Sequence, residues 1–235
     1  MSEQIGNVWV FIEQEGGKIA DLRDALCRGA DNAVLLTDRA FAGADTLATS
    51  YALSKCAGKI GKFDLILCGR QAIDGDTAQV GPQIAEKLHL PQISYVEEVL
   101  ELNEKTVKAR RAIEGGYEIL ETPTPALFTV IDANEPRPKN ATRIMKYKKA
   151  KSKLDLGADA TAEDVEKLAA KDLLIQAWSA TDVGAAPERI GFAGSPTKVK
   201  QIQSVVLTAG DYKAVEATDA GVTNLIHELI EDHTL

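Results

Sequence analysis

The residues of this chain that are best suited to chemistry lie in a short polar segment between positions 69 and 79. Asp74 and Asp76 are carboxylates, Thr77 and Gln79 can donate or accept hydrogen bonds, and Gly75 lets a ligand approach the backbone closely. Such residues ahead of a helix suit the binding of a phosphate or another anion. They suit a capped helix after an ordinary turn equally well, because neither the dinucleotide nor the P-loop glycine pattern is present.

A strand, a loop and a helix must position this segment. The apolar run 64–68 (DLILC) predicts a strand that is buried on both faces. After the loop, Val80, Ile84 and Leu88 recur at helical spacing. In a parallel sheet, this order places the free N–H groups of the helix at the carboxyl edge of the strand, where anions are stabilised. The segment is therefore expected at the edge of the sheet where ligands usually bind, and an ordinary capped helix stays an equal alternative.

The residue types that usually break and form bonds are not arranged for catalysis. His89, His227 and His233 have no metal-ligand spacing, and Ser195 lacks the frame of a nucleophile elbow. Its neighbour Pro196 fits a turn instead. No nucleophile, base and orienting group can be assembled from the spacing of these residues. The sequence therefore favours a binding protein or a carrier over an enzyme.

Composition and charge exclude several classes of protein. A chain of 235 residues with 45% hydrophobic residues can bury a sizeable core. Its net charge of -8 argues against a nucleic-acid partner, because such a protein presents a basic face to phosphates. Cys27, Cys56 and Cys68 are odd in number and widely spaced, so we expect reduced, buried thiols rather than disulfides or a zinc site.

Targeting signals are not evident in the sequence. No apolar run approaches the length of a membrane span, and residues 1–4 lack the charged and apolar regions of a signal peptide. We therefore expect a cytoplasmic protein without a membrane span.

The pattern along the chain predicts an α/β fold. Apolar runs at 7–12 and 33–37 flank a helical pattern at 19–27, which gives a right-handed β-α-β unit whose strand 7–12 should be central in the sheet. A further helix is expected over 44–55. Short alternating segments at 93–100, 106–113 and 117–122 predict an antiparallel meander, after which 126–132 returns to the main sheet.

The second part of the chain looks different. Residues 134–153 are rich in Lys, Arg and Pro, which by itself predicts a solvated basic loop. Helices are expected at 162–170 and 219–231, separated by stretches rich in Gly, Ser and Pro. We therefore expect a nucleotide-binding α/β domain over 1–150, and over 151–235 an extended arm with a final helix that contacts a partner subunit.

Four segments together resemble one family. The sequence GRQAIDGDTAQVG at 69–81 resembles the nucleotide-binding loop of the electron transfer flavoprotein beta subunit. A second signature of that family resembles ARRAIEGGYE at 109–118 followed by PAL at 125–127, and NEPR at 134–137 with IMK at 144–146 and GSPTK at 194–198 agree further along. The likeness runs from about residue 25 to the C-terminus. It implies a doubly wound, mostly parallel sheet of the adenine nucleotide alpha hydrolase-like type, with a small antiparallel meander and an extended C-terminal arm.

The resemblance implies an electron carrier rather than an enzyme. Such a subunit passes electrons between dehydrogenases through FAD and holds a nucleotide of its own, which is AMP in simple members and a second FAD in electron-bifurcating, NADH-linked members. The form CGRQAIDGDTAQVGP at 68–82 is closer to the bacterial and anaerobic versions, so we favour FAD over AMP. The resemblance assigns the nucleotide to Thr46, Cys68, Gly69, Arg70, Ala72, Asp76, Thr77, Ala78, Gln79 and Val80.

The resemblance also implies two protein partners. The arm would contact the alpha subunit of the flavoprotein, and the basic loop would dock a flavoenzyme of the acyl-CoA dehydrogenase type, as in fatty acid oxidation. The residues assigned to that docking are Asn134, Glu135, Arg137, Ala141, Ile144, Met145 and Lys146.

The start of the chain departs from the family. Beta subunits have about thirty more residues before the stretch GADNAVLLTDRAFAGAD, and the opening NVWVFIEQ at 7–14 is more similar to the start of the alpha subunit. Two alternatives therefore stay open. One is a stand-alone adenine-nucleotide-binding domain of regulatory or ATP-cleaving type, and the other is a chimera that binds a partner and no nucleotide.

Overall fold

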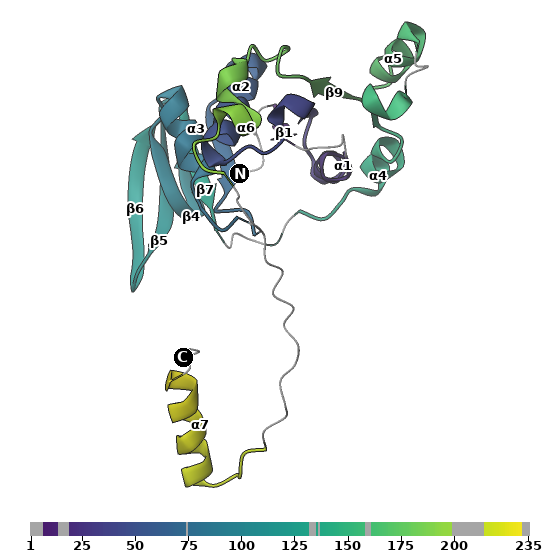
Figure 1. The fold of residues 1–235 in the computed structure, drawn as a ribbon. Helices are drawn as coiled ribbons and strands as arrows, with labels where there is room; N and C mark the ends of the chain where they lie inside the picture. Colours follow the sequence, from purple (N-terminus) through teal and green to yellow (C-terminus); the bar gives the residue numbers. More distant parts are fainter. Residues whose placement is uncertain are drawn as a thin grey trace. The chain divides into compact units, whose positions relative to one another are not determined.

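The computed structural model describes residues 7–13, 19–73, 75–131, 135, 137–157, 161–198 and 214–231. The chain divides into two compact units, residues 1–198 and residues 199–235. Residues 151–198, expected to belong to the arm, therefore lie in the first unit. Figure 1 shows the helices and strands of that unit.

The elements follow the alternation expected from the sequence. The first half contains β1 (Trp9–Glu13), α1 (Ala20–Arg28), β2 (Asn32–Leu36), η2 (Arg39–Phe41), α2 (Thr46–Ile60), β3 (Leu65–Gly69), α3 (Val80–Leu88), β4 (Gln92–Leu102), β5 (Thr106–Ile113), β6 (Gly116–Pro123) and β7 (Ala126–Val130). The remainder contains α4 (Ala141–Tyr147), β8 (Lys151–Ser152), η3 (Leu154–Leu156), α5 (Ala162–Ala169), β9 (Leu174–Trp178), η4 (Pro187–Arg189), α6 (Gly191–Gly194) and α7 (Asp219–Glu231).

Strand β2 shows why helices cover both faces of the first sheet. Its side chains alternate between two cores, and Val34, Leu35 and Leu36 are all fully buried. Leu35 packs with residues of α1 and α4, whereas Val34 and Leu36 pack with residues of α2 and of the segment 180–190. The strand is thus buried on both sides, as a parallel strand in a doubly wound fold should be.

The first sheet has the order β1-β2-β9-β8, and all of its pairs are parallel. Strand β9 lies beside β2, with Val34 opposite Gln176 and Leu36 opposite Trp178. The prediction that 7–12 is a central strand is wrong, because β1 stands at an edge and its residues are only half-buried. Local pattern could not show that β9, which follows β2 by more than 130 residues, takes the inner position.

The second sheet has the order β3-β7-β4-β5-β6. Strand β7 pairs in parallel with both β3 and β4, and β4, β5 and β6 form the expected antiparallel meander. The return of 126–132 to a sheet is therefore confirmed for β7. In Figure 1 the meander forms one side of the first unit, next to α3. A parallel sheet and a mixed sheet together confirm the α/β class.

Strand β3 is less buried than the sequence suggests. Ile66 is buried against α2 and α3, but Leu67 is 61% exposed. The prediction of a strand buried on both faces is wrong here. Strand β3 is an edge of its sheet, and within the described part of the chain the face next to Leu67 is less covered than the face next to Ile66.

The final helix α7 belongs to the second unit. Four of its large apolar side chains are 37% to 51% exposed, and they are Val222, Leu225, Ile226 and Ile230. A helix with an apolar face and no core of its own has to bury that face against another surface. Among the helices that the structure describes, none is both long enough and apolar enough to cross a membrane.

Candidate functional site

Helix α3 approaches strand β7 unusually closely at Gly81. A Cβ atom at this position would lie 2.6 Å from Cγ2 of Thr129 and 3.6 Å from Cβ of Cys68. Only glycine fits such a contact. The glycine therefore sets how near the start of α3 comes to the ends of β3 and β7, and with it the shape of the preceding loop.

The loop between β3 and α3 is held in an unusual backbone conformation. Asp76 and Ala78 have φ values of 47° and 52°, in the left-handed region that most residues avoid. Asp76 is fixed by a backbone hydrogen bond to Ala72 O of 3.0 Å and by the side-chain amide of Gln71. Among the described residues, the N–H groups of Thr77 and Ala78 donate to no acceptor. Strained backbone with free donors is a feature of ligand-binding loops.

A polar network joins the start of α3 to the start of α2. Thr46 Oγ1 donates to Gln79 Oε1 over 2.9 Å, and Gln83 Nε2 lies 3.5 Å from the same hydroxyl. Ser50 Oγ donates to Gln83 Oε1 over 2.9 Å. The N-termini of two helices thus face one corner, and their combined dipoles favour an anion there.

The cap of helix α2 is built from two distant parts of the chain. Asp45 Oδ1 accepts the N–H groups of Leu47 and Ala48 at 3.0 and 3.1 Å, and its Oδ2 accepts the N–H and hydroxyl of Thr197 at 3.0 and 2.7 Å. Burial alone would raise the pKa of Asp45, but these hydrogen bonds outweigh it and hold the pKa below its usual value. The charged carboxylate is therefore the form that the fold prefers.

The buried hydroxyl of Ser195 completes this junction. Ser195 Oγ accepts the N–H of Asp45 over 2.8 Å and donates to the carbonyl oxygen of Gly191 over 2.7 Å. With both bonds made, the serine is a structural residue, in agreement with the absence of a nucleophile pattern. Within the described residues, no group of three or more His, Cys, Asp or Glu side chains is arranged to hold a metal ion.

The residues assigned to nucleotide binding lie together at this corner. Gly69, Arg70, Ala72, Asp76, Thr77 and Gln79 are exposed, and Thr46, Cys68, Ala78 and Val80 are half-buried. Burial raises the pKa of the Cys68 thiol to about 11, so the sulfur is neutral at pH 7. Asp74 of the same loop lies outside the described residues. The corner therefore offers a ligand backbone donors, hydroxyls and amides, with Arg70 as an exposed cation.

The segment assigned to docking contains a helix where a loop was expected. Asn140 caps α4 by accepting the N–H of Arg143 over 3.1 Å, a signal that was readable in the sequence. Arg143 donates to the carbonyl oxygens of Leu26 and Ala30 at the end of α1, and Tyr147 is buried in the core beside them. These anchors stabilise a short helix, so the prediction of a loop is wrong over 141–147.

The other assigned residues that the structure describes are exposed, on helix α4 or in the segment before it. Ile144 and Met145 are 39% and 60% exposed, and Glu135, Arg137 and Ala141 are exposed as well. Lys146 is exposed too, and its Nζ lies 3.4 Å from Oδ2 of Asp172. Asn134 lies outside the described residues.

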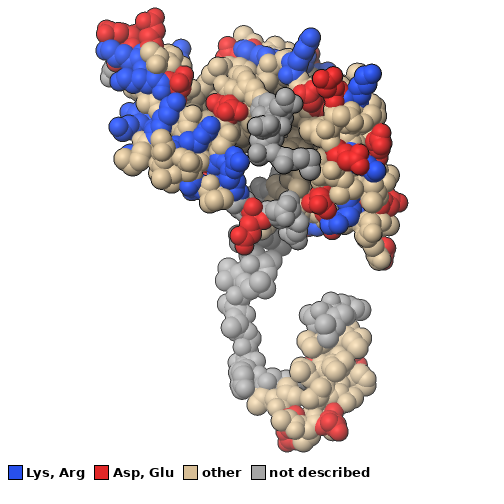
Figure 2. Space-filling view, turned by 180° about the vertical axis from the view of Figure 1, so that it is seen from behind, with Lys and Arg blue, Asp and Glu red and all other residues tan. Residues whose placement is uncertain are grey.

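Charge is distributed unevenly over the first unit. Figure 2 shows Lys and Arg side chains gathered over the part built from α1, α4 and α5, with Asp and Glu at the tip formed by α5. Two of these cations, Arg28 and Lys139, are paired with Asp24. The exposed apolar residues of α4 thus lie in a basic surround, which suits an acidic partner surface.

Sequence reasoning missed several residues that shape the corner. In the sequence, Ser50 and Gln83 look like ordinary helix residues. Gly81 is the last residue of the motif at 69–81, and the sequence predicts no separate role for it. Each of these hydrogen bonds joins residues 33 positions apart, Thr46 to Gln79 and Ser50 to Gln83. No local pattern in the sequence predicts such a pair. The sequence GSPTK at 194–198 had been noted only for its resemblance to the family, and its contact with Asp45 was not predicted.

Comparison with known proteins identifies the family of the chain. A profile of the electron transfer flavoprotein domain matches residues 3–155. The electron transfer flavoprotein subunit beta of Clostridium acetobutylicum is 45% identical over 181 residues, which cover 77% of this chain and 60% of the relative. The subunit beta of Thermoanaerobacterium thermosaccharolyticum is 42% identical, covering 89% and 70%. The caffeyl-CoA reductase-Etf complex subunit CarD of Acetobacterium woodii is 38% identical, covering 91% and 73%.

The matches thus cover about 60% to 73% of the length of these three relatives. The identities of 38% to 45% over most of this chain, together with a family profile that matches residues 3–155, show the family. The chain belongs to the electron transfer flavoprotein family, among the beta subunits.

Proposed function

We propose that this chain holds an adenine nucleotide at the corner between β3 and α3 and serves as the electron-carrier beta subunit of a flavoprotein. The observation that carries the proposal is the exposed loop 70–79, in which Asp76 and Ala78 hold left-handed conformations and the N–H groups of Thr77 and Ala78 are free among the described residues. A capped helix needs no such strain. A ligand with phosphate groups supplies the missing acceptors.

The residues at the corner fit the phosphate and ribose parts of a nucleotide. Backbone donors of Thr77 and Ala78 and the Arg70 guanidinium suit phosphate oxygens, because charge-assisted and backbone hydrogen bonds are the usual phosphate contacts. Thr46 and Gln79 offer a hydroxyl and an amide, which suit ribose or base atoms. FAD, when bound, supplies the redox chemistry, and the chain's own residues bind it, orient it and exclude water.

We favour FAD over AMP as the nucleotide. The loop sequence at 68–82 is of the bacterial and anaerobic form, and among the similar proteins is a subunit of a caffeyl-CoA reductase-Etf complex. This supports a place for the chain in an NADH-linked, bifurcating complex. AMP is the alternative ligand of the same corner, since both share the adenosine and the first phosphate.

Two partner surfaces complete the proposal. The segment 151–235 with helix α7 contacts the alpha subunit, and the exposed apolar side chains of α7 support this. Helix α4 docks a flavoenzyme of the acyl-CoA dehydrogenase type, with Ile144 and Met145 as the apolar tip within a basic surface. Transient electron-transfer contacts are commonly small and steered by charge.

The experiment is to produce the chain with a cognate alpha subunit and to count flavins per heterodimer from absorbance and released nucleotide. Two flavins per heterodimer support FAD at the corner, and one flavin with one AMP supports the simpler carrier. A purified heterodimer with flavin in the alpha subunit and no nucleotide in this chain overturns the proposal for the corner.

A further inference from the structure

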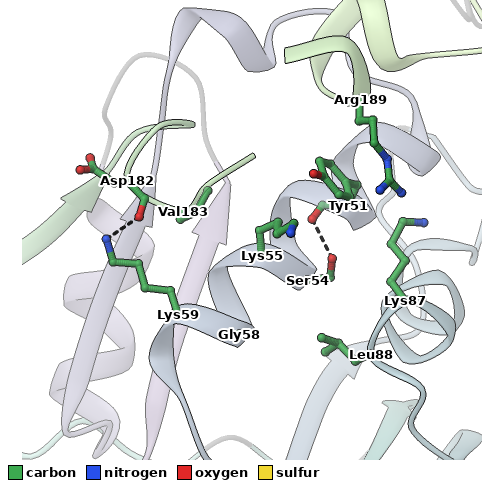
Figure 3. Close-up of a pocket in the computed structure, with 10 residues that line it drawn as sticks. All are labelled: Tyr51, Ser54, Lys55, Gly58, Lys59, Lys87, Leu88, Asp182, Val183 and Arg189. Atoms are coloured by element: carbon green, nitrogen blue, oxygen red, sulfur yellow. Dashed lines mark hydrogen bonds between the residues drawn. The ribbon is translucent and has the colours of Figure 1, made fainter. Parts of the chain in front are cut away.

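A second cavity, of about 600 Å³, lies apart from the nucleotide corner. It is bordered by the C-terminal half of α2, by the end of α3 and by the segment 182–189. The corner described above is at the other end of α2, where Thr46 begins the helix. Figure 3 shows the side chains that line the cavity.

Four cations surround this space. Lys55 and Lys59 come from α2, Lys87 from α3 and Arg189 from η4, so the charges converge from three elements. Among the residues that the structure describes, no carboxylate oxygen lies within 4.0 Å of any of these four groups. Four cations around one space, in a chain of net charge -8, make a local excess of positive charge.

The single acid in the lining does not neutralise them. The Asp182 carboxylate accepts the N–H and the hydroxyl of Ser179 over 2.8 and 2.7 Å, and Figure 3 shows it directed away from the cavity. Only its backbone carbonyl oxygen turns inward, where it accepts Lys59 Nζ over 2.6 Å. A carbonyl orients a lysine without removing its charge.

Three of the cations lie over aromatic rings, and Lys55 is the most distant, with its Nζ 5.6 Å from the centroid of Tyr51. The Arg189 guanidinium lies 4.0 Å from the ring centroid of Tyr51, whose hydroxyl accepts the N–H of Ala186 over 3.1 Å. Lys59 Nζ lies 4.6 Å from the ring of Trp178. Fixed cations lose little conformational entropy when an anion binds, so the site is preorganised.

Like charges in this space repel one another. Partial burial and the neighbouring charge of Arg189 lower the pKa of Lys87 below its usual value. The charges of Asp45 and Glu86 act on the pKa of Lys87 in the opposite direction without cancelling this effect, so an anion bound between the cations relieves the remaining repulsion. An anion with several charges relieves it most, because it contacts cations from more than one element at once.

From this geometry we propose a second anion site on the chain, for a small molecule that carries at least two phosphate groups, held by Lys55, Lys87 and Arg189 with Lys59 at its edge. The cavity is of the size that encloses small ligands, whereas an acidic protein segment would need a longer, flatter basic surface. With the Tyr51 face occupied by Arg189, the site binds through phosphate charge rather than by stacking a base. The proposal does not depend on a nucleotide at the first corner.

The test uses the full chain and inorganic pyrophosphate as the probe, with binding measured by titration calorimetry. We expect one bound pyrophosphate, weakened at least tenfold in the double variant Lys55→Gln/Lys87→Gln, because each lost charged hydrogen bond lowers affinity by about that factor. The matched control Lys105→Gln/Lys171→Gln removes the same charge from exposed positions outside the cavity and should bind as the wild type does. The conservative variant Lys55→Arg/Lys87→Arg should retain binding.

Several outcomes overturn the proposal. If the control variant weakens pyrophosphate binding as much as the cavity variant does, the affinity depends on the overall charge of the chain and not on the cavity. Displacement of pyrophosphate by saturating AMP places it at the β3–α3 corner instead. Binding of a glutamate decapeptide in the absence of pyrophosphate binding assigns the surface to a protein partner. Thermal unfolding without ligand verifies that the Gln variants fold, and Lys87→Gln alone should not lower the midpoint, because it relieves the repulsion with Arg189.

Discussion

The close contact between α3 and β7 predicts that a larger residue at Gly81 lowers the free energy of unfolding. Replacing Gly81 with Ala places a methyl group 2.6 Å from Cγ2 of Thr129. Thr129 is only 3% exposed, so its methyl cannot turn into solvent. The helix must therefore move away from the strand, and overpacking of this kind costs about 1 to 3 kcal/mol.

Helix propensity acts in the opposite direction. Alanine is favoured over glycine by up to about 1 kcal/mol inside a helix, and by less in the first turn, where Gly81 lies. The difference leaves a net loss of about 0.5 to 2 kcal/mol in the free energy of unfolding. For a chain of this size, each kcal/mol lowers the thermal midpoint by about 2 to 4 °C.

The assay is urea unfolding followed by tryptophan fluorescence, with Thr129→Ser as the partner substitution. Serine removes Cγ2 but keeps the hydroxyl oxygen that accepts the N–H of Tyr95 over 3.1 Å. The double variant Gly81→Ala/Thr129→Ser should therefore be less destabilised than the sum of its two single variants, by about 0.5 kcal/mol or more.

A stabilised Gly81→Ala protein would refute the reasoning, because propensity would then be the only effect of the added methyl. Strict additivity of the two substitutions would refute it as well. Both results would mean that the start of α3 is free to shift and does not fix the loop at the nucleotide corner.

Four further predictions follow from other contacts. Asp45→Asn should lower the unfolding midpoint at pH 7. Because the pKa of Asp45 is depressed in the folded state, the difference in midpoint between the variant and the wild type should shrink as the pH falls below 3.8. A difference that stays constant with pH would contradict this. Cys56, whose pKa burial raises to about 12, should react with iodoacetamide at pH 8 only after unfolding, as mass spectrometry of the native and the urea-treated chain can show. Gln79→Ala should weaken AMP or FAD binding about tenfold in a fluorescence titration while leaving thermal stability nearly unchanged, because the side chain is exposed. Arg137→Glu with Lys146→Glu should slow electron transfer to a dehydrogenase without preventing assembly with an alpha subunit, and failed assembly would show that the segment has a different role.

Much of the fold follows from periodicity alone. The bounds of α7 at 219–231 are those expected from its apolar spacing, and α1, α5, β5 and β7 lie within two residues of the predicted segments. These elements form where local pattern, caps and turns agree. The capping box of α5, in which Thr161 and Asp164 bond reciprocally, is one such case.

The order of the strands does not follow from periodicity. A run such as 7–12 shows that a strand is apolar, but not which neighbours it acquires. Strand β9 takes the place beside β2 because Ile175 fills the core between α1 and α4. Such a choice depends on packing across the whole unit, and a single sequence carries no signal of it.

The candidate corner, like the fold, could be predicted only in part from the sequence. The loop 70–79 could be located from its residue types, yet its geometry is set by contacts that are remote in sequence. Asp45 and Thr197 are 152 residues apart, and one carboxylate serves both helix α2 through Oδ1 and the segment 195–198 through Oδ2. Thr46, the residue after Asp45, donates a hydrogen bond to Gln79 at the end of the loop. A substitution at Thr197 can therefore alter the loop through Asp45 and the first turn of α2. The segment 195–198 is thus mechanically coupled to the corner through Asp45.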